Sequence, residues 1–118
     1  MIIPKEIDEQ RTFIDWLKRK RIPFAAVPNG QKRTRWQAQQ AKKEGMTAGV
    51  SDLFVFTPNK IVFVEMKRRK KSVSRVSEKQ REFLEMVNRF EYAAGIVCYG
   101  AQDAIERIEQ ILDDSGVK

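Results

Sequence analysis

Residues 49–67 read GVSDLFVFTPNKIVFVEMK and contain two β-rich runs, residues 52–56 and 61–67. The residues between the runs include a proline and an asparagine, which favour a turn. The segment therefore predicts a β-hairpin. In the register that a four-residue loop imposes, Phe54 pairs with Phe63, and Asp52 lies opposite Glu65. Lys67 lies two residues beyond Glu65 and projects from the same face of its strand.

Asp52, Glu65 and Lys67 together are the residue types of a catalytic centre. Like charges that face each other across a sheet destabilise it, so the two carboxylates require positive charge nearby. Carboxylate oxygens suit Mg²⁺ or Mn²⁺ as ligands, and the Lys67 ammonium can orient a water and stabilise developing negative charge. This combination indicates a phosphodiester hydrolase. The alternative is an exposed hairpin face that carries the three charges without a function.

The residues around this trio resemble a known group of nucleases. Asp52, a loop and then Glu65-Met66-Lys67 are similar to the core of the PD-(D/E)XK nuclease superfamily. The segments Gly49-Val50-Ser51-Asp52 and Ser77-x-x-Gln80 add a resemblance to its virus-type replication-repair nuclease (VRR-NUC) family, over nearly the whole chain. Ser51 stands where the family usually has proline. That proline is a backbone feature and not a ligand, so the difference leaves the chemistry in place.

The resemblance implies a role for each of these residues. Asp52 and Glu65 are expected to hold Mg²⁺ or Mn²⁺, and the backbone carbonyl of Met66 to complete the shell of the ion. Lys67 is expected to act in catalysis. Gln80 is expected to support the site from the helix that Ser77 and Gln80 open as a capping box.

The first helix is expected to add a further carboxylate. VRR-NUC domains typically carry Glu-x-x-x-Gln on this helix, which Glu6 and Gln10 match. The resemblance therefore implies that Glu6 belongs to the catalytic and metal-binding residues, with Glu9 as its nearest rival. Acidic residues also stabilise a helix N-terminus through the macrodipole, which is the structural explanation for both.

The resemblance further implies what the protein does. It predicts a metal-dependent, structure-selective endonuclease that cuts branched DNA in the manner of Holliday-junction-resolving enzymes, in DNA repair or recombination, as a homodimer. Two other functions stay open. One is a non-enzymatic nucleic-acid-binding protein whose acidic residues are a relic or a salt-bridge cluster. The other is an RNA-cleaving nuclease of the same architecture.

Length and composition limit the alternatives. A chain of 118 residues predicts a single domain over residues 1–118. The net charge of +7 favours a polyanionic partner, with DNA as the first candidate. The absence of histidine excludes a histidine-based acid–base pair, and the single Cys98 excludes an internal disulfide. No apolar run approaches the roughly 20 residues of a membrane span, so we expect no membrane contact and a location in the cytoplasm of a bacterial or phage-infected cell.

The remaining elements follow from hydrophobic periodicity and turn residues. Helices are predicted over residues 5–20, 77–90 and 102–112, and a short strand over residues 24–27. The apolar run 93–99 predicts a strand parallel to residues 61–67 and interior to the sheet. The order predicts an α/β fold, a restriction-endonuclease-like sandwich in which helices flank a central mixed β-sheet with an αβββαβ core.

Two basic segments are candidates for nucleic-acid contact. The first spans residues 31–45, where a helix docked on the core through its tryptophan is the alternative. The second is a loop after the Glu-x-Lys strand that we expect to be mobile. Their candidate residues are Lys32, Arg33, Arg35, Trp36, Lys42 and Lys43 in the first segment, and Arg68, Arg69, Lys70, Lys71 and Arg75 in the second. Trp16, Trp36 and Tyr92 lie partly off the predicted core stripes, so they are expected either in a subunit contact or at the edges of the core.

Overall fold

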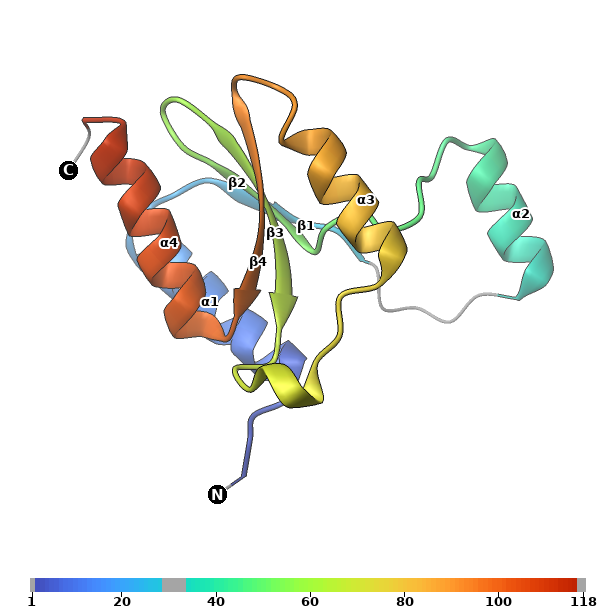
Figure 1. Cartoon of the computed structure of the whole chain (residues 1–118), viewed down its shortest axis with the longest axis horizontal. Helices are drawn as coiled ribbons and strands as arrows, with labels where there is room; N and C mark the ends of the chain where they lie inside the picture. Colours follow the sequence, from blue (N-terminus) through green and yellow to red (C-terminus); the bar gives the residue numbers. More distant parts are fainter. Residues whose placement is uncertain (1, 29–33, 117–118) are drawn as a thin grey trace.

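A four-stranded mixed sheet forms the centre of the computed structural model, which describes residues 2–28 and 34–116 (Figure 1). The strands are β1 (Phe24–Ala26), β2 (Leu53–Phe56), β3 (Ile61–Lys67) and β4 (Ala93–Tyr99), and they lie in the order β1-β2-β3-β4. β1 and β3 are both antiparallel to β2, and β4 is parallel to β3. The predicted α/β sandwich is confirmed.

The hairpin has the predicted register. Phe54 pairs with Phe63 and Phe56 with Ile61, and the ladder between β2 and β3 ends at Leu53 and Val64. Asp52 comes directly before β2. The four-residue loop closes through the backbone N–H of Thr57, which donates to the carbonyl of Lys60 at 2.9 Å. The turn therefore sets which side chains share a face.

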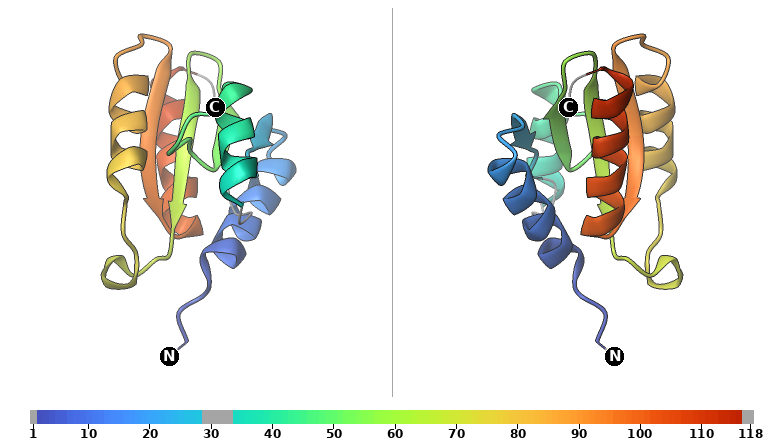
Figure 2. Two further views of the ribbon diagram at one scale, coloured as in Figure 1. Left: turned by 90° about the vertical axis from the view of Figure 1, so that its right-hand side faces the viewer. Right: turned by 90° about the vertical axis from the view of Figure 1, so that its left-hand side faces the viewer.

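Helices cover both faces of the sheet (Figure 2). α1 (Glu6–Arg19) and α4 (Ala101–Asp114) pack together on one face, and α3 (Glu78–Val87) lies on the other. The core on the α1 and α4 side takes alternate residues of β3, namely Val62, Val64 and Met66. The other alternate set, which contains Phe63, Glu65 and Lys67, faces α3, where Phe63 contacts Phe83. The predicted site residues therefore lie on the α3 face.

β4 lies at an edge of the sheet, so the prediction that it is interior was wrong. Its apolar sequence has another cause, because α3 packs on one face of the strand and α4 on the other. Side chains from the helical layers on both faces form hydrogen bonds with backbone groups of this strand. Asn88 bonds both the N–H and the carbonyl of Gly95, Arg107 donates to the carbonyl of Val97, and Asp103 accepts from the N–H of Tyr99. These bonds hinder pairing with another strand.

The remaining elements lie outside the sandwich. α2 (Arg35–Lys43) begins at Thr34, whose side chain forms a capping box with Gln37, and stands apart from the layered body (Figure 1). A 3₁₀ turn, η1 (Lys71–Val73), follows β3, so the loop expected to be mobile contains ordered structure. Among the described residues, no helix has the length and apolar character that a bilayer crossing requires.

Gly49 brings the chain into β2 at a position where a side chain cannot fit. Its φ is +83°, and an added Cβ would lie 2.3 Å from the carbonyl oxygen of Lys79 and 2.8 Å from the backbone nitrogen of Gln80. The loop that carries Asp52 therefore packs directly on the first turn of α3. This contact gives the glycine of the Gly-x-Ser-Asp segment a structural reason.

We predict that Gly49→Ala destabilises the fold by more than 2 kcal/mol, because it combines a strained φ with a backbone collision. Gly45→Ala is the matched control, since Gly45 has φ +92° but open space around its Cβ position. The control should lose only about 1 kcal/mol. Chemical denaturation of both variants measures the difference, and equal losses would contradict the close approach.

Candidate active site

Three carboxylates from distant parts of the chain meet at one end of the sheet. Glu6 comes from the first turn of α1, Asp52 from the residue before β2, and Glu65 from β3. One ligand oxygen of each lies within 4.8 Å of the others. The Asp52 carboxylate also accepts a hydrogen bond of 2.8 Å from the backbone N–H of Met66, which fixes it to the neighbouring strand. The Met66 side chain is fully buried in the core, so only its backbone is at the site.

Gln80 joins the catalytic candidates in one network. Its side-chain oxygen accepts from the Lys67 ammonium at 3.1 Å, and its amide nitrogen donates to Glu65 at 3.1 Å. The same oxygen accepts from the backbone N–H of Ser77, while the Ser77 hydroxyl accepts from the N–H of Gln80. The predicted capping box is therefore present, and it holds Gln80 between Lys67 and Glu65.

Lys67 is the counter-charge of Glu65. Its ammonium lies 3.9 Å from the Glu65 carboxylate, and both side chains are almost fully buried. Burial first, and then the nearby Asp52 carboxyl, together raise the pKa of Glu65 to about 9, while Lys67 acts in the opposite direction. Burial also raises the pKa of Glu6, with Lys67 lowering it and Asp52 raising it. The three acidic groups therefore compete for a limited amount of positive charge.

The donor set fits a hard divalent cation. One oxygen of the Glu65 side chain, Oε1, is buried and has no hydrogen-bond partner among the described residues. A buried carboxylate oxygen without a partner is costly unless a proton or a cation occupies it. Because all three neighbouring side-chain ligands are carboxylates, Mg²⁺ or Mn²⁺ suits them better than a soft metal. Glu6, Asp52 and Glu65 could together hold such an ion.

The raised pKa of Glu65 predicts how stability depends on pH without metal. Protonated Glu65 stabilises the folded state below the ordinary pKa of 4.5, and this contribution is lost as the pH rises toward 9. In EDTA, Glu65→Gln should therefore gain stability relative to the unsubstituted chain between pH 5 and 9, by on the order of 1 kcal/mol per pH unit. Denaturation at several pH values tests this, and parallel profiles would contradict it.

Glu9, the rival of Glu6, is placed elsewhere. Its side chain is 2% exposed and accepts two hydrogen bonds from the Arg69 guanidinium, at 2.7 and 3.2 Å. It also accepts from the backbone N–H of Ala101 at the start of α4. The hydrogen bond from Arg69 is the main reason why the pKa of Glu9 is lowered. Glu6 therefore joins the carboxylate cluster, and Glu9 joins α1 to the segment after β3 and to α4.

Apart from Arg68 and Arg69, the predicted nucleic-acid residues fall into three groups. Arg35, Trp36, Lys42 and Lys43 are exposed on α2, where Trp36 is 67% exposed and is not docked on the core. Lys32 and Arg33 lie outside the described residues. Lys70, Lys71 and Arg75 are exposed after β3, and the Lys71 ammonium lies 4.9 Å from the centre of the Tyr99 ring.

Arg68 and Arg69 have contacts that the sequence did not suggest. Arg68 donates to the carbonyls of Ile3 and Pro4, at 2.7 and 2.9 Å, and Arg69 forms the ion pair with Glu9. Both guanidinium groups are thus engaged within the chain.

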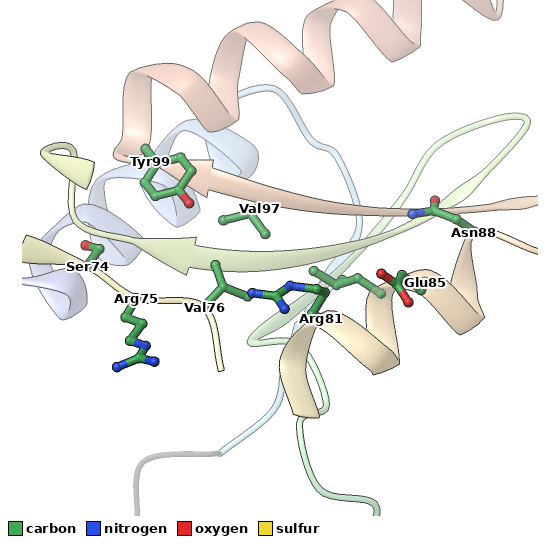
Figure 3. A pocket seen from close by; sticks show the side chains of 9 residues that line it. Ser74, Arg75, Val76, Arg81, Glu85, Asn88, Val97 and Tyr99 are labelled. Carbon is green, nitrogen blue, oxygen red and sulfur yellow. The ribbon is translucent and has the colours of Figure 1, made fainter. Parts of the chain in front are cut away.

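A groove of about 480 Å³ runs between α3, β4 and the segment after η1 (Figure 3). Its lining residues are Ser74, Arg75, Val76, Arg81, Leu84, Glu85, Asn88, Val97 and Tyr99. None of the three clustered carboxylates lines it. Arg81 places a second guanidinium group in the groove beside Arg75. The sequence did not single out Arg81, because it follows Gln80 on a helix that was predicted from its capping residues.

Trp16, Trp36 and Tyr92 differ in burial. Trp16 is 8% exposed and stacks on Phe13, so it belongs to the core. Trp36 and Tyr92 are 67% and 70% exposed.

Both the sequence and the fold of this chain match known proteins. Residues 27–102 match the sequence model of the VRR-NUC domain. A solved structure described as a VRR_NUC domain protein superposes with a TM-score of 0.75 at 20% sequence identity, covering 95% of this chain and 91% of that chain. At this identity the superposition establishes a shared fold. No curated protein matches the sequence.

Proposed function

We propose that the chain is a Mg²⁺- or Mn²⁺-dependent endonuclease acting on branched DNA. The chain belongs to the VRR-NUC family of PD-(D/E)XK nucleases. Membership of this family indicates nuclease chemistry and a nucleic-acid substrate. The observation that carries the metal dependence is the meeting of Glu6, Asp52 and Glu65, with oxygens within 4.8 Å of one another. A non-catalytic binding protein would have no need to bury Glu65 beside another carboxylate.

Each residue of the centre has a proposed role. Asp52, Glu65 and Glu6 would hold the ion, and the backbone carbonyl of Met66 would add a further ligand. A bound ion would supply a Lewis acid and lower the pKa of water. Lys67 orients the attacking water and neutralises charge that develops on the phosphate. Gln80 keeps the Lys67 ammonium and the Glu65 carboxylate in place through its two hydrogen bonds.

Substrate binding is proposed for the exposed basic surfaces of the chain. The exposed cations of α2 and of the segment after β3 can contact phosphates, and Trp36 is exposed enough to stack on a base. Arg75 and Arg81 line the groove beside β4, where two guanidinium groups can follow a phosphate backbone.

We predict that Asp52→Asn and Glu65→Gln each lower kcat by about 100-fold or more, because each removes a metal ligand, while DNA binding stays equal or becomes tighter. Lys67→Ala should lose a similar factor, and Lys67→Arg should not restore it, since a planar guanidinium cannot replace a compact ammonium beside a water. The measurement is single-turnover cleavage of labelled DNA with and without Mg²⁺ or Mn²⁺.

Exposed acidic residues far from the centre provide the control. Asp114→Asn at the end of α4 should leave cleavage unchanged. Near-normal turnover of Asp52→Asn or Glu65→Gln at saturating metal would refute the assigned centre. If the chain binds DNA but cleaves it under none of these conditions, the non-enzymatic binding function would be favoured instead.

We further propose that the chain acts as a homodimer. A branched junction has approximate two-fold symmetry, and two identical sites can cut opposing strands. The occupied backbone groups of β4 disfavour a dimer through sheet extension. Exposed Tyr92 is a better candidate for the contact, since Trp36 is proposed to stack on a base.

The assembly and the substrate can be measured together. Light scattering at micromolar concentration should give about twice 13.8 kDa, and a four-way junction should be cut faster than duplex, single-stranded or flap DNA. A monomeric mass that persists with junction DNA would exclude the dimeric resolvase. Preferential cleavage of the corresponding RNA would instead favour an RNA-cleaving nuclease.

A further inference from the structure

The start of α1 is held by the residues that directly follow β3. Arg68 directly follows Lys67, and its guanidinium donates to the carbonyls of Ile3 and Pro4. The backbone N–H of Arg68 donates to the Ser74 hydroxyl at 3.0 Å, which fixes the arginine itself. Chain positions just before α1 are therefore attached to the strand that presents Glu65 and Lys67.

The next residue makes a second attachment one turn into the helix. Arg69 binds Glu9 through two parallel N–H groups, the geometry that makes an arginine–carboxylate pair both strong and directional. Glu9 is 2% exposed and also accepts from Ala101, so its position is defined from two sides. An added Cβ at Gly100 would lie 2.8 Å from the Cβ of Arg69, so this junction has little free space.

Glu6 lies between the two attachments. It is two residues after Pro4 and three residues before Glu9, in the first turn of α1. The N-cap of this helix, Lys5, makes no side-chain capping bond, so the start of the helix lacks the local device that fixes α2 and α3. The contacts of Arg68 and Arg69, which follow β3, therefore help to fix the turn that carries Glu6.

We propose that Arg68 and Arg69 are positioning residues, a clamp that holds Glu6 against Asp52 and Glu65. The clamp rests on the proposed function, because it supposes that Glu6 helps to hold a metal ion. It replaces the expectation that these two arginines serve substrate phosphates. Glu6 and Glu9 lie outside residues 27–102, which match the family, so the clamp joins a segment beyond the matched region to the centre within it.

The test compares Arg68→Gln and Arg69→Gln with Lys70→Gln, which removes the same charge from an exposed neighbour. Calorimetric titration with Mn²⁺ in the absence of DNA should show about ten-fold weaker binding for the two arginine variants and no change for the control. In a Glu6→Gln background, Arg69→Gln should cause no further loss, because the clamp acts through Glu6.

DNA binding separates a clamp from a phosphate contact. The slope of log Kd against log salt should be unaffected by Arg69→Gln, whereas a lost phosphate contact would change it by about 0.9. Unchanged Mn²⁺ affinity in both arginine variants, or additive losses with Glu6→Gln, would overturn the clamp.

Hydrogen exchange gives a readout without metal. Exchange of the Asp8 and Glu9 amides, which donate to the Lys5 carbonyl, should accelerate in the arginine variants and not in Lys70→Gln. An unsubstituted chain that binds no Mn²⁺ would refute the proposed metal centre. The exchange rates would then decide alone whether Arg68 and Arg69 hold α1, and unchanged rates would reject the attachment as well.

Discussion

The burial of the Glu65 carboxylate at the end of β3 is the constraint on which the arrangement of the site depends. A charge removed from water needs compensation, and the neighbouring Asp52 makes the need greater. Lys67 supplies part of it from the same strand, and Gln80 from α3. The remaining oxygen, Oε1, has no hydrogen-bond partner among the described residues. The hairpin register, the capping box of α3 and the close packing of Gly49 all serve to keep these groups within reach of one another.

Local patterns were sufficient to predict most of this geometry. A four-residue loop and period-two alternation determine that Asp52, Glu65 and Lys67 share a face, so the hairpin could be derived from residues close in sequence. Ser77 and Gln80 form a capping box at the predicted spacing. The resemblance to VRR-NUC nucleases supplied what spacing could not, namely that the polar Gln80 belongs beside the acidic residues and that α1 contributes Glu6.

Features that depend on contacts between distant segments were not predictable in this way. The apolar sequence of β4 reflects the helices that cover both of its faces. A central strand and a covered edge strand have the same apolar pattern, so the sequence does not distinguish them. Arg68 and Arg69 read as part of a solvated basic loop because their partners are 60 or more residues away. Glu9 could not be told from Glu6 by helical periodicity alone, since both lie on the side that faces the body of the protein.

The attachment of α1 also determines when the centre can form as the chain leaves the ribosome. α1 is synthesised first, but Glu9 bonds to Ala101, 92 residues later, and Arg68 reaches back 65 residues to Ile3. Contacts of such long range are made late, because the chain must close large loops before it gains from them. A nascent chain that has not yet released α4 lacks one of the contacts that define Glu9. The turn that carries Glu6 is thus fixed in its final position only after later segments of the chain have been made.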